Sequence, residues 1–116
     1  MTMDLVIRNG TVATASDSFK ADIGITEGRI TAIAESLSAE RVIDATGKVV
    51  LPGFVSAHNH VGYAVFRGRA EDVGYAPTHR LYLPMSGVIT NSEREVIGAL
   101  AVTELLRGGV TTILEM

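Results

Sequence analysis

The chain has 116 residues, which leaves room for one domain of ordinary size. Hydrophobic residues make up 47% of it and charged residues 20%, a balance that excludes global disorder because enough apolar surface is present to offset the ordering entropy. The net charge of −3 argues against nucleic-acid and anionic-membrane partners, and the absence of cysteine excludes disulfides and thiolate metal sites.

The first residues of the chain do not resemble a secretory signal, because Asp4 is followed by no long apolar run. The longest uncharged apolar stretch, residues 49–55, is interrupted by Pro52 and Gly53. It is far shorter than the roughly 20 residues of a membrane-spanning helix. We therefore expect a cytoplasmic protein without a membrane partner.

Residues 1–52 have the pattern of a small β layer. Short apolar or alternating segments are separated by turn residues, among them Asn9-Gly10 and Glu27-Gly28. A further polar turn is expected at residues 44–47. The predicted strands lie near residues 5–7, 11–13, 23–25, 30–32, 42–43 and 49–51.

The pattern changes at Gly53. Residues 54–58 form a nearly continuous apolar run, which is typical of a strand buried on both faces. Residues 61–89 show no clean periodicity and contain several glycines and prolines. An irregular connection of that length is often a lid or a binding loop, and plain disorder is the alternative.

A helix and a second strand are predicted next. Thr90 and Glu93 have the spacing of a capping box, and Gly108 and Gly109 are expected to end the helix because glycine adopts the left-handed cap conformation at little cost. Residues 110–114 then predict a strand, so the order strand, helix, strand indicates a parallel pair with a right-handed crossover. The apolar stripe of the helix is predicted at Val96, Ile97, Leu100, Ala101, Glu104 and Leu105.

His58 and His60 are the strongest candidates for chemistry. In an extended segment, residues i and i+2 project from the same face, so both imidazoles can reach one ion. The pair ends a strand that leads into a crossover, which is where α/β barrels keep their active sites. The spacing predicts a metal site, and its alternative is two loop histidines that happen to be neighbours.

Two ligands do not complete a catalytic zinc site, which usually has three protein ligands. The remaining candidates are His79, Glu71, Asp72 and Glu115. We expect His79 at the surface and the acidic pair in solvent. Glu115, at the end of the second strand, is expected either to orient a histidine or to be an exposed strand-end carboxylate.

Arg67 is the candidate for substrate binding. Together with Arg69 it follows the histidines closely and could clamp an anionic or carbonyl-rich substrate. The alternative is a salt bridge to Glu71 or Asp72.

These residues, in this order, resemble the amidohydrolase superfamily. Residues 4–10, 21–25, 28–30 and 42–47 are similar to its N-terminal β-domain. Residues 51–60, Leu-Pro-Gly-Phe-Val-Ser-Ala-His-Asn-His, resemble its first barrel strand with the His-x-His metal motif. The resemblance covers essentially the whole chain.

Two later segments resemble one subgroup of that superfamily. Residues 65–69 and 103–116 look most like the triazine hydrolases, the cytosine and guanine deaminases and the S-adenosylhomocysteine deaminases. The opening strands are equally similar to hydantoinases and dihydropyrimidinases.

The resemblance implies a mixed α/β fold. Residues 1–52 would be part of a small β-sandwich domain, and residues 53–116 would be the first strand-helix-strand of a (β/α)8 barrel that is incomplete in this chain. It also implies one divalent metal ion, Zn or Fe, held in part by His58 and His60. That metal would activate water to attack a ring or amide carbon of a small-molecule substrate.

The family's later metal ligands and its catalytic acid/base lie on barrel strands that this chain lacks. We therefore expect the 116-residue chain to be inactive by itself. We also expect it to be homo-oligomeric or completed by further chain.

Two alternatives remain open at this point. A hydantoinase-like or dihydropyrimidinase-like enzyme would open a cyclic amide with two metals bridged by a modified lysine, which would lie beyond Met116. A non-catalytic binding or oligomerisation module would carry a surface metal site at His58 and His60, with its bare strands covered by another copy.

Overall fold

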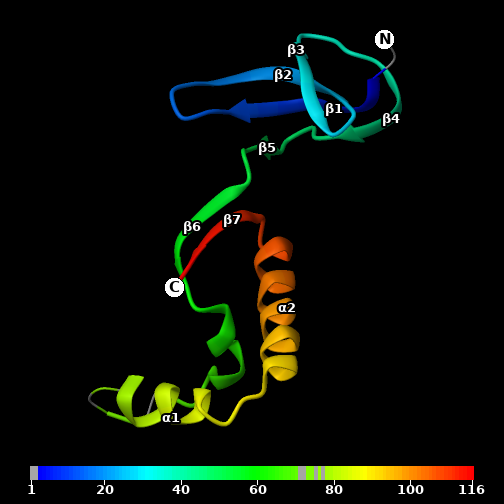
Figure 1. Cartoon of the computed structure of the whole chain (residues 1–116). Coiled ribbons are helices and arrows are strands. Elements are labelled where there is room, and N and C mark those ends of the chain that lie inside the picture. Colours follow the sequence, from blue (N-terminus) through cyan, green and yellow to red (C-terminus); the bar gives the residue numbers. More distant parts are fainter. Residues whose placement is uncertain (1–2, 71–72, 75, 77) are drawn as a thin grey trace. The chain divides into compact units, whose positions relative to one another are not determined.

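The computed structural model describes residues 3–70, 73–74, 76 and 78–116. The chain divides into two compact units, Met1–Pro52 and Gly53–Met116, each of which has its own β-sheet (Figure 1). Helices and strands are both present, so the predicted mixed α/β class is confirmed. Among the described residues, no helix combines the length and the apolar character needed to cross a membrane.

The first unit is a five-stranded mixed sheet with the order β3-β2-β1-β4, in which β5 also pairs with β1. The β1–β2 and β2–β3 pairs are antiparallel, whereas β4 and β5 run parallel to β1. The strands are β1 (Met3–Ala13), β2 (Ser18–Thr26), β3 (Arg29–Ala34), β4 (Ala39–Asp44) and β5 (Val49–Val50).

The predicted tight turn at Asn9 and Gly10 is wrong, because β1 continues through both residues. The register between β1 and β2 shifts at this point, and Asn9 has a φ of 63°. The Asn9 backbone N–H donates to Asp22 at 2.9 Å, and its side-chain amide donates to Asp44 at 3.2 Å. Carboxylates from the two neighbouring strands thus hold the left-handed residue in a bulge, and the hairpin reverses at residues 14–17 instead.

The other two predicted turns of this unit are confirmed. Glu27 and Gly28 join β2 to β3 with φ values of 51° and 71°, the positive pair that a two-residue hairpin turn requires. Residues 44–47 connect β4 to β5, and there Asp44 accepts hydrogen bonds from the Thr46 backbone N–H at 3.0 Å and from the Thr46 hydroxyl at 2.6 Å.

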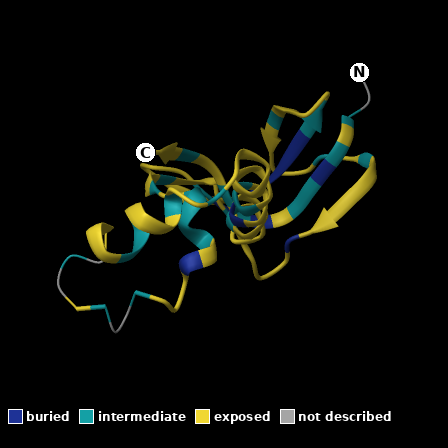
Figure 2. Cartoon of the chain, turned by 60° about the horizontal axis from the view of Figure 1, so that its bottom comes forward, coloured by how far each residue is buried: buried dark blue, intermediate teal, exposed yellow. Residues whose placement is uncertain are grey.

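The core of the first unit lies on β1 and β2, where Figure 2 shows buried residues in both strands. Val6 is fully buried, and Val12, Ala21 and Ile23 form one apolar cluster. Asp22, between two of these residues, is 3% exposed.

Asp22 is buried with partners for its carboxylate. It accepts hydrogen bonds from the backbone N–H groups of Asn9 at 2.9 Å and Leu37 at 3.0 Å, and the Arg8 guanidinium lies 3.7 Å away. These two backbone hydrogen bonds, with a smaller contribution from the Arg8 charge, lower the pKa of Asp22 below its ordinary value. The carboxylate therefore ties β1, β2 and the loop after β3 together.

The second unit is built on two parallel strands, β6 (Phe54–Asn59) and β7 (Val110–Glu115), connected through the helix α2 (Asn91–Arg107). This is the predicted strand-helix-strand order. The capping box at the start of α2 is confirmed, since Thr90 accepts from the Glu93 backbone N–H and Glu93 accepts from that of Thr90.

The segment between β6 and α2 is more regular than its sequence suggests. It contains a 3-10 helix, η1 (Val61–Phe66), a π-helical turn, η2 (Thr78–Tyr82), and a short α-helix, α1 (Leu83–Ser86). The expectation of an irregular or disordered loop is therefore wrong for these residues. Short helical turns of four to six residues are too brief to produce a readable apolar period.

Half of the residues in the apolar stripe predicted for α2 are exposed, and one is buried. Ala101 is buried, whereas Val96 is 70% exposed and Leu100 is 56% exposed. A sheet of two strands offers too little surface to cover the stripe, and parallel sheets normally need covering on both faces.

Candidate functional site

The two candidate histidines lie together at the carboxyl end of β6. The strand ends at Asn59, and His60 follows with φ −137° and ψ 72° as the residue before the first turn of η1. The two imidazoles lie on the same side, as side chains two positions apart at the end of a strand do. Their Nε2 atoms are 3.2 Å apart, and the rings meet edge to face with centroids 4.9 Å apart.

The separation of the two Nε2 atoms suits a shared metal ion. Two imidazole nitrogens that each lie about 2.0–2.1 Å from a tetrahedral zinc are about 3.3 Å from one another. The observed 3.2 Å is close to that value, and both side chains are exposed. The same distance also allows one Nε2–H to donate a hydrogen bond to the other Nε2. The donor pair thus fits two positions of a divalent-metal site.

The backbone around the two histidines is held on both sides. The Asn59 side chain, between them, donates to the Ser56 hydroxyl at 2.5 Å. Glu115 lies opposite Asn59 in the β6–β7 register, and its two carboxylate oxygens accept the Val61 backbone N–H at 2.9 and 3.1 Å. Glu115 therefore acts on the peptide that follows His60, and the hydrogen bond found for it is to the backbone and not to an imidazole.

Arg67 lies just after η1 and is paired with Glu104 of α2. Its Nη1 and Nη2 donate to the two carboxylate oxygens at 3.3 and 2.6 Å, which is a bidentate pair. The hydrogen bonds raise the pKa of Arg67 and lower that of Glu104. The partners considered from the sequence, Glu71 and Asp72, lie outside the described residues.

A group of aromatic side chains that the sequence pattern did not reveal extends from His60 through Tyr63. The Tyr63 ring stacks on the His60 ring with centroids 5.5 Å apart and planes at 30°. Tyr82 stacks on Tyr63, with ring centroids 4.9 Å apart, and Phe66 packs against both tyrosines. The available signal was the spacing of three between His60, Tyr63 and Phe66, which places them on one side of a 3-10 turn.

A hollow of about 450 Å³ lies beside this group. His60, Tyr63, Arg67, Tyr82 and Glu104 are among the residues that line it. Arg67 and His60 therefore border the same space, although the guanidinium is directed to Glu104.

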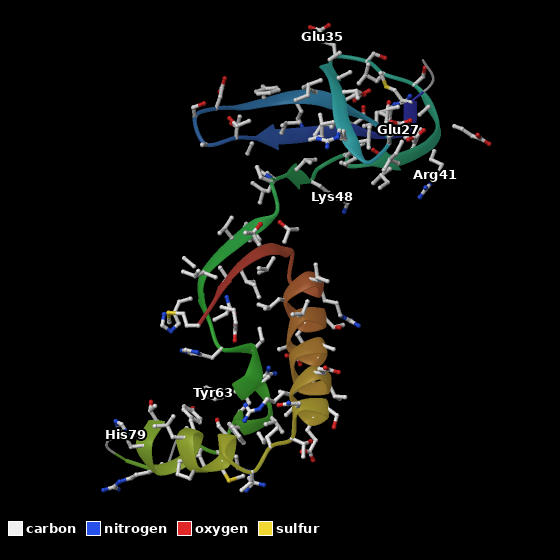
Figure 3. The ribbon with its side chains drawn as sticks, in the orientation of Figure 1. Glu27, Glu35, Arg41, Lys48, Tyr63 and His79 are labelled. Carbon is white, nitrogen blue, oxygen red and sulfur yellow. The ribbon has the colours of Figure 1, made fainter. Side chains whose placement is uncertain are left out.

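His79 does not join the pair. It lies on η2, and Figure 3 shows it at the far end of that helical segment, away from β6. Within residues 3–70, 73–74, 76 and 78–116, no three side chains of His, Asp or Glu gather in a metal-binding group. Among the described residues, His58 and His60 thus form a pair without a third side chain of this kind beside them.

Known proteins resemble this chain over most of its length. Residues 49–116 match the amidohydrolase family. A 5-methylthioadenosine/S-adenosylhomocysteine deaminase of Thermococcus onnurineus (strain NA1) is 35% identical over 119 aligned residues, which cover 98% of this chain and 28% of that protein. A D-hydantoinase of Ralstonia pickettii is 45% identical over 71 residues, which cover 60% of this chain and 16% of that protein.

Among solved structures, the atrazine chlorohydrolase of Arthrobacter aurescens TC1, determined in complex with zinc, is similar with a TM-score of 0.81. It is 28% identical, and the match covers 96% of this chain and 28% of that one. The chain thus spans little more than a quarter of the length of the deaminase and of the chlorohydrolase. On the family match and the identity to the deaminase, the chain belongs to the amidohydrolase family.

Proposed function

We propose that this chain supplies the first two metal ligands of a metal-dependent hydrolase that deaminates an amino-heterocycle. The observation that carries the proposal is the 3.2 Å approach of the His58 and His60 Nε2 atoms at the carboxyl end of β6. Membership of the amidohydrolase family supports it, as does the similarity of nearly the whole chain to a deaminase.

The residues of this chain would hold and orient the site. His58 and His60 would each present Nε2 to one divalent ion, with zinc or iron as the candidates, and the zinc-bound chlorohydrolase favours zinc. When bound, such a metal lowers the pKa of a coordinated water to about 7, which supplies a hydroxide nucleophile near neutral pH. Glu115 would keep the peptide after His60 in place, and Arg67 would border the substrate space.

The two units would have separate roles in the complete fold. We propose that residues 1–52 form part of a small β-sandwich and that residues 53–116 open a (β/α)8 barrel. Support comes from the TM-score of 0.81 to the chlorohydrolase and from the parallel β6–α2–β7 order. Histidines at the carboxyl end of a first barrel strand would then face the mouth of the barrel, where such enzymes have their active sites.

Zinc binding by the purified 116-residue chain tests the ligand assignment. Competition with a chromophoric chelator should show that His58→Ala and His60→Ala each lose most of the affinity of the parent chain. His79→Ala is the matched control and should bind zinc as the parent does, because His79 lies on η2. Equal affinity of the parent and both site variants would remove the metal site from the proposal.

The activity requires the complete protein as its natural source produces it. That protein should release ammonia from a panel of amino-heterocycles and should stop after chelation of its metal. The 116-residue chain should show no turnover. Ammonia release by this chain alone would contradict the proposed division of the site.

The second candidate activity is cyclic-amide hydrolysis, which the 45% identity to the D-hydantoinase over 71 residues favours. The two activities differ in their products. A deaminase liberates ammonia and leaves the ring closed, whereas a cyclic-amide hydrolase opens the ring without ammonia. Incubation of the complete protein with both substrate panels, followed by product analysis, separates them.

A further inference from the structure

We propose that Tyr63 is a positioning residue that holds the His60 imidazole with its Nε2 directed at the Nε2 of His58. This inference rests on the proposed metal site. It adds aromatic packing to the contacts that hold that site in place. The proposal concerns four rings, His60, Tyr63, Tyr82 and Phe66, which we call the aromatic column.

Tyr63 is placed to constrain His60 directly. It lies in the first turn of η1, and its backbone N–H donates to the His60 carbonyl at 3.0 Å. Its ring covers one face of the imidazole at a centroid distance of 5.5 Å and an interplanar angle of 30°. The edge of the same imidazole meets His58 at 88°. His60 is therefore bounded by Tyr63 on its face and by His58 at its edge.

The Tyr63 ring is itself held by two further aromatic rings. Tyr82 stacks on it at 4.9 Å and 20°, and Phe66 lies 6.0 Å from it and 5.9 Å from Tyr82. Phe66 is only 5% exposed, whereas Tyr63 and Tyr82 are half-buried and His60 is exposed. The column thus runs from a buried ring to an exposed one, and Figure 3 labels Tyr63 beside η1.

An exposed imidazole without such a neighbour samples several side-chain rotamers, and only some of them aim Nε2 at the second ligand. Ordering the ring before the metal binds reduces the entropy that binding must otherwise remove. The stacked ring of Tyr63 does this without a hydrogen bond, and offset aromatic pairs are favourable beyond the area that they bury. The expected gain is a modest factor in affinity and not the whole of it.

The test measures zinc affinity of the 116-residue chain by chelator competition, with no need for turnover. Tyr63→Leu removes the ring and should weaken binding about three- to tenfold. Tyr63→Phe keeps the ring and should bind zinc within about twofold of the parent. If the hydroxyl of Tyr63 were the important group, Tyr63→Phe would bind as weakly as Tyr63→Leu. Phe19→Leu, an aromatic-to-leucine change on β2 in the first unit, is the matched control and should have no effect.

A second readout follows the His60 ring itself in the absence of metal. In the parent and in Tyr63→Phe, NMR side-chain couplings should report one dominant rotamer of His60, and in Tyr63→Leu they should report averaging. Hydrogen exchange of the β6 and β7 amides should be unchanged in all three, so that loss of folding is not mistaken for loss of orientation.

The outcomes separate the two proposals. If His60→Ala loses zinc but Tyr63→Leu binds it as the parent does, with averaged rotamers or not, the positioning role is overturned while the metal site stands. If His60→Ala has no effect, the metal site fails first. Should Tyr63→Leu unfold the second unit, Tyr82→Leu decides: weaker zinc binding supports the column, and parental affinity overturns it.

Discussion

The two units of the chain are stabilised in different ways. The first unit has a buried cluster on β1 and β2 and a buried carboxylate that accepts two backbone hydrogen bonds. In the described part of the second unit, Phe66 and Ala101 are the buried hydrophobic residues, while Val55, Val96 and Leu106 are more than half exposed. The first unit therefore has an apolar core, whereas the second unit depends more on individual polar contacts.

Those polar contacts of the second unit are specific. They comprise the local capping box of α2 and two long-range contacts, the Arg67–Glu104 pair and the hydrogen bonds from Val61 to Glu115. Each of them sets the direction of a segment and buries little apolar surface. The comparison teaches that the first unit is organised around an apolar core, whereas the segment with the candidate chemistry relies on polar contacts together with the aromatic column.

The largest expected effect is on the core of the first unit. Ile23→Ala should destabilise its sheet by about 2–5 kcal/mol, because the side chain is 5% exposed and its loss leaves a cavity. Hydrogen exchange of the β1 and β2 amides measures this free energy. Ile33→Ala on β3, where the side chain is 50% exposed, is the control and should cost far less. Equal effects of the two changes would show that the sheet has no real core.

A smaller effect is expected at the buried carboxylate. The pKa of Asp22 in the folded chain lies below its ordinary value of 3.8, because the Asn9 and Leu37 N–H groups stabilise its charge. The stability that these two hydrogen bonds contribute is therefore fully present above pH 3.8. It is lost as the pH falls through the lowered pKa of Asp22. The stability of the first unit should decrease below about pH 4.

Asp22→Asn sharpens this prediction. The variant should be less stable at neutral pH and should lose less of its stability on acidification, measured by urea unfolding at several pH values. Glu40→Gln, a change at an exposed position of β4, should keep the acid-induced loss. An unchanged acid-induced loss in Asp22→Asn would assign it to other carboxylates.

The next effect concerns the start of α2. Thr90→Ala removes the oxygen that accepts the Glu93 backbone N–H, and should cost about 1 kcal/mol in the second unit. Exchange of the first α2 amides measures it. Glu95→Ala, an exposed change within the same helix, should leave these amides protected. A loss of protection in both variants would mean that fraying of the helix, and not the cap, is being measured.

The smallest effect is expected for the exposed ion pair. Glu104→Gln should lower the thermal midpoint of the second unit only slightly at low salt, because both partners are largely in solvent. The difference from the parent should shrink further at high salt, where charges are screened. A large and salt-independent loss would show that Arg67 and Glu104 act through packing.

Several parts of the molecule were predictable from short stretches of sequence. Thr90 and Glu93 mark the start of α2, Gly109 adopts the left-handed conformation after its end with φ 84°, and the β-branched residues that follow predict β7. The pairing of His58 with His60 followed from their spacing of two in an extended segment. Each of these features depends on residues within four positions of one another.

Other parts depended on residues far apart along the chain, and only the tertiary structure decided them. Asn9 occupies a bulge and not a turn, because Asp22 and Asp44 reach it from neighbouring strands. Arg67 pairs with Glu104 across 37 positions, and Glu115 accepts the Val61 N–H across 54. Local preference ranks the conformations of a segment, but a hydrogen bond between distant segments forms only when the whole unit brings them together. For that reason the histidine pair could be found in the sequence, and the contacts that hold the segment around it could not.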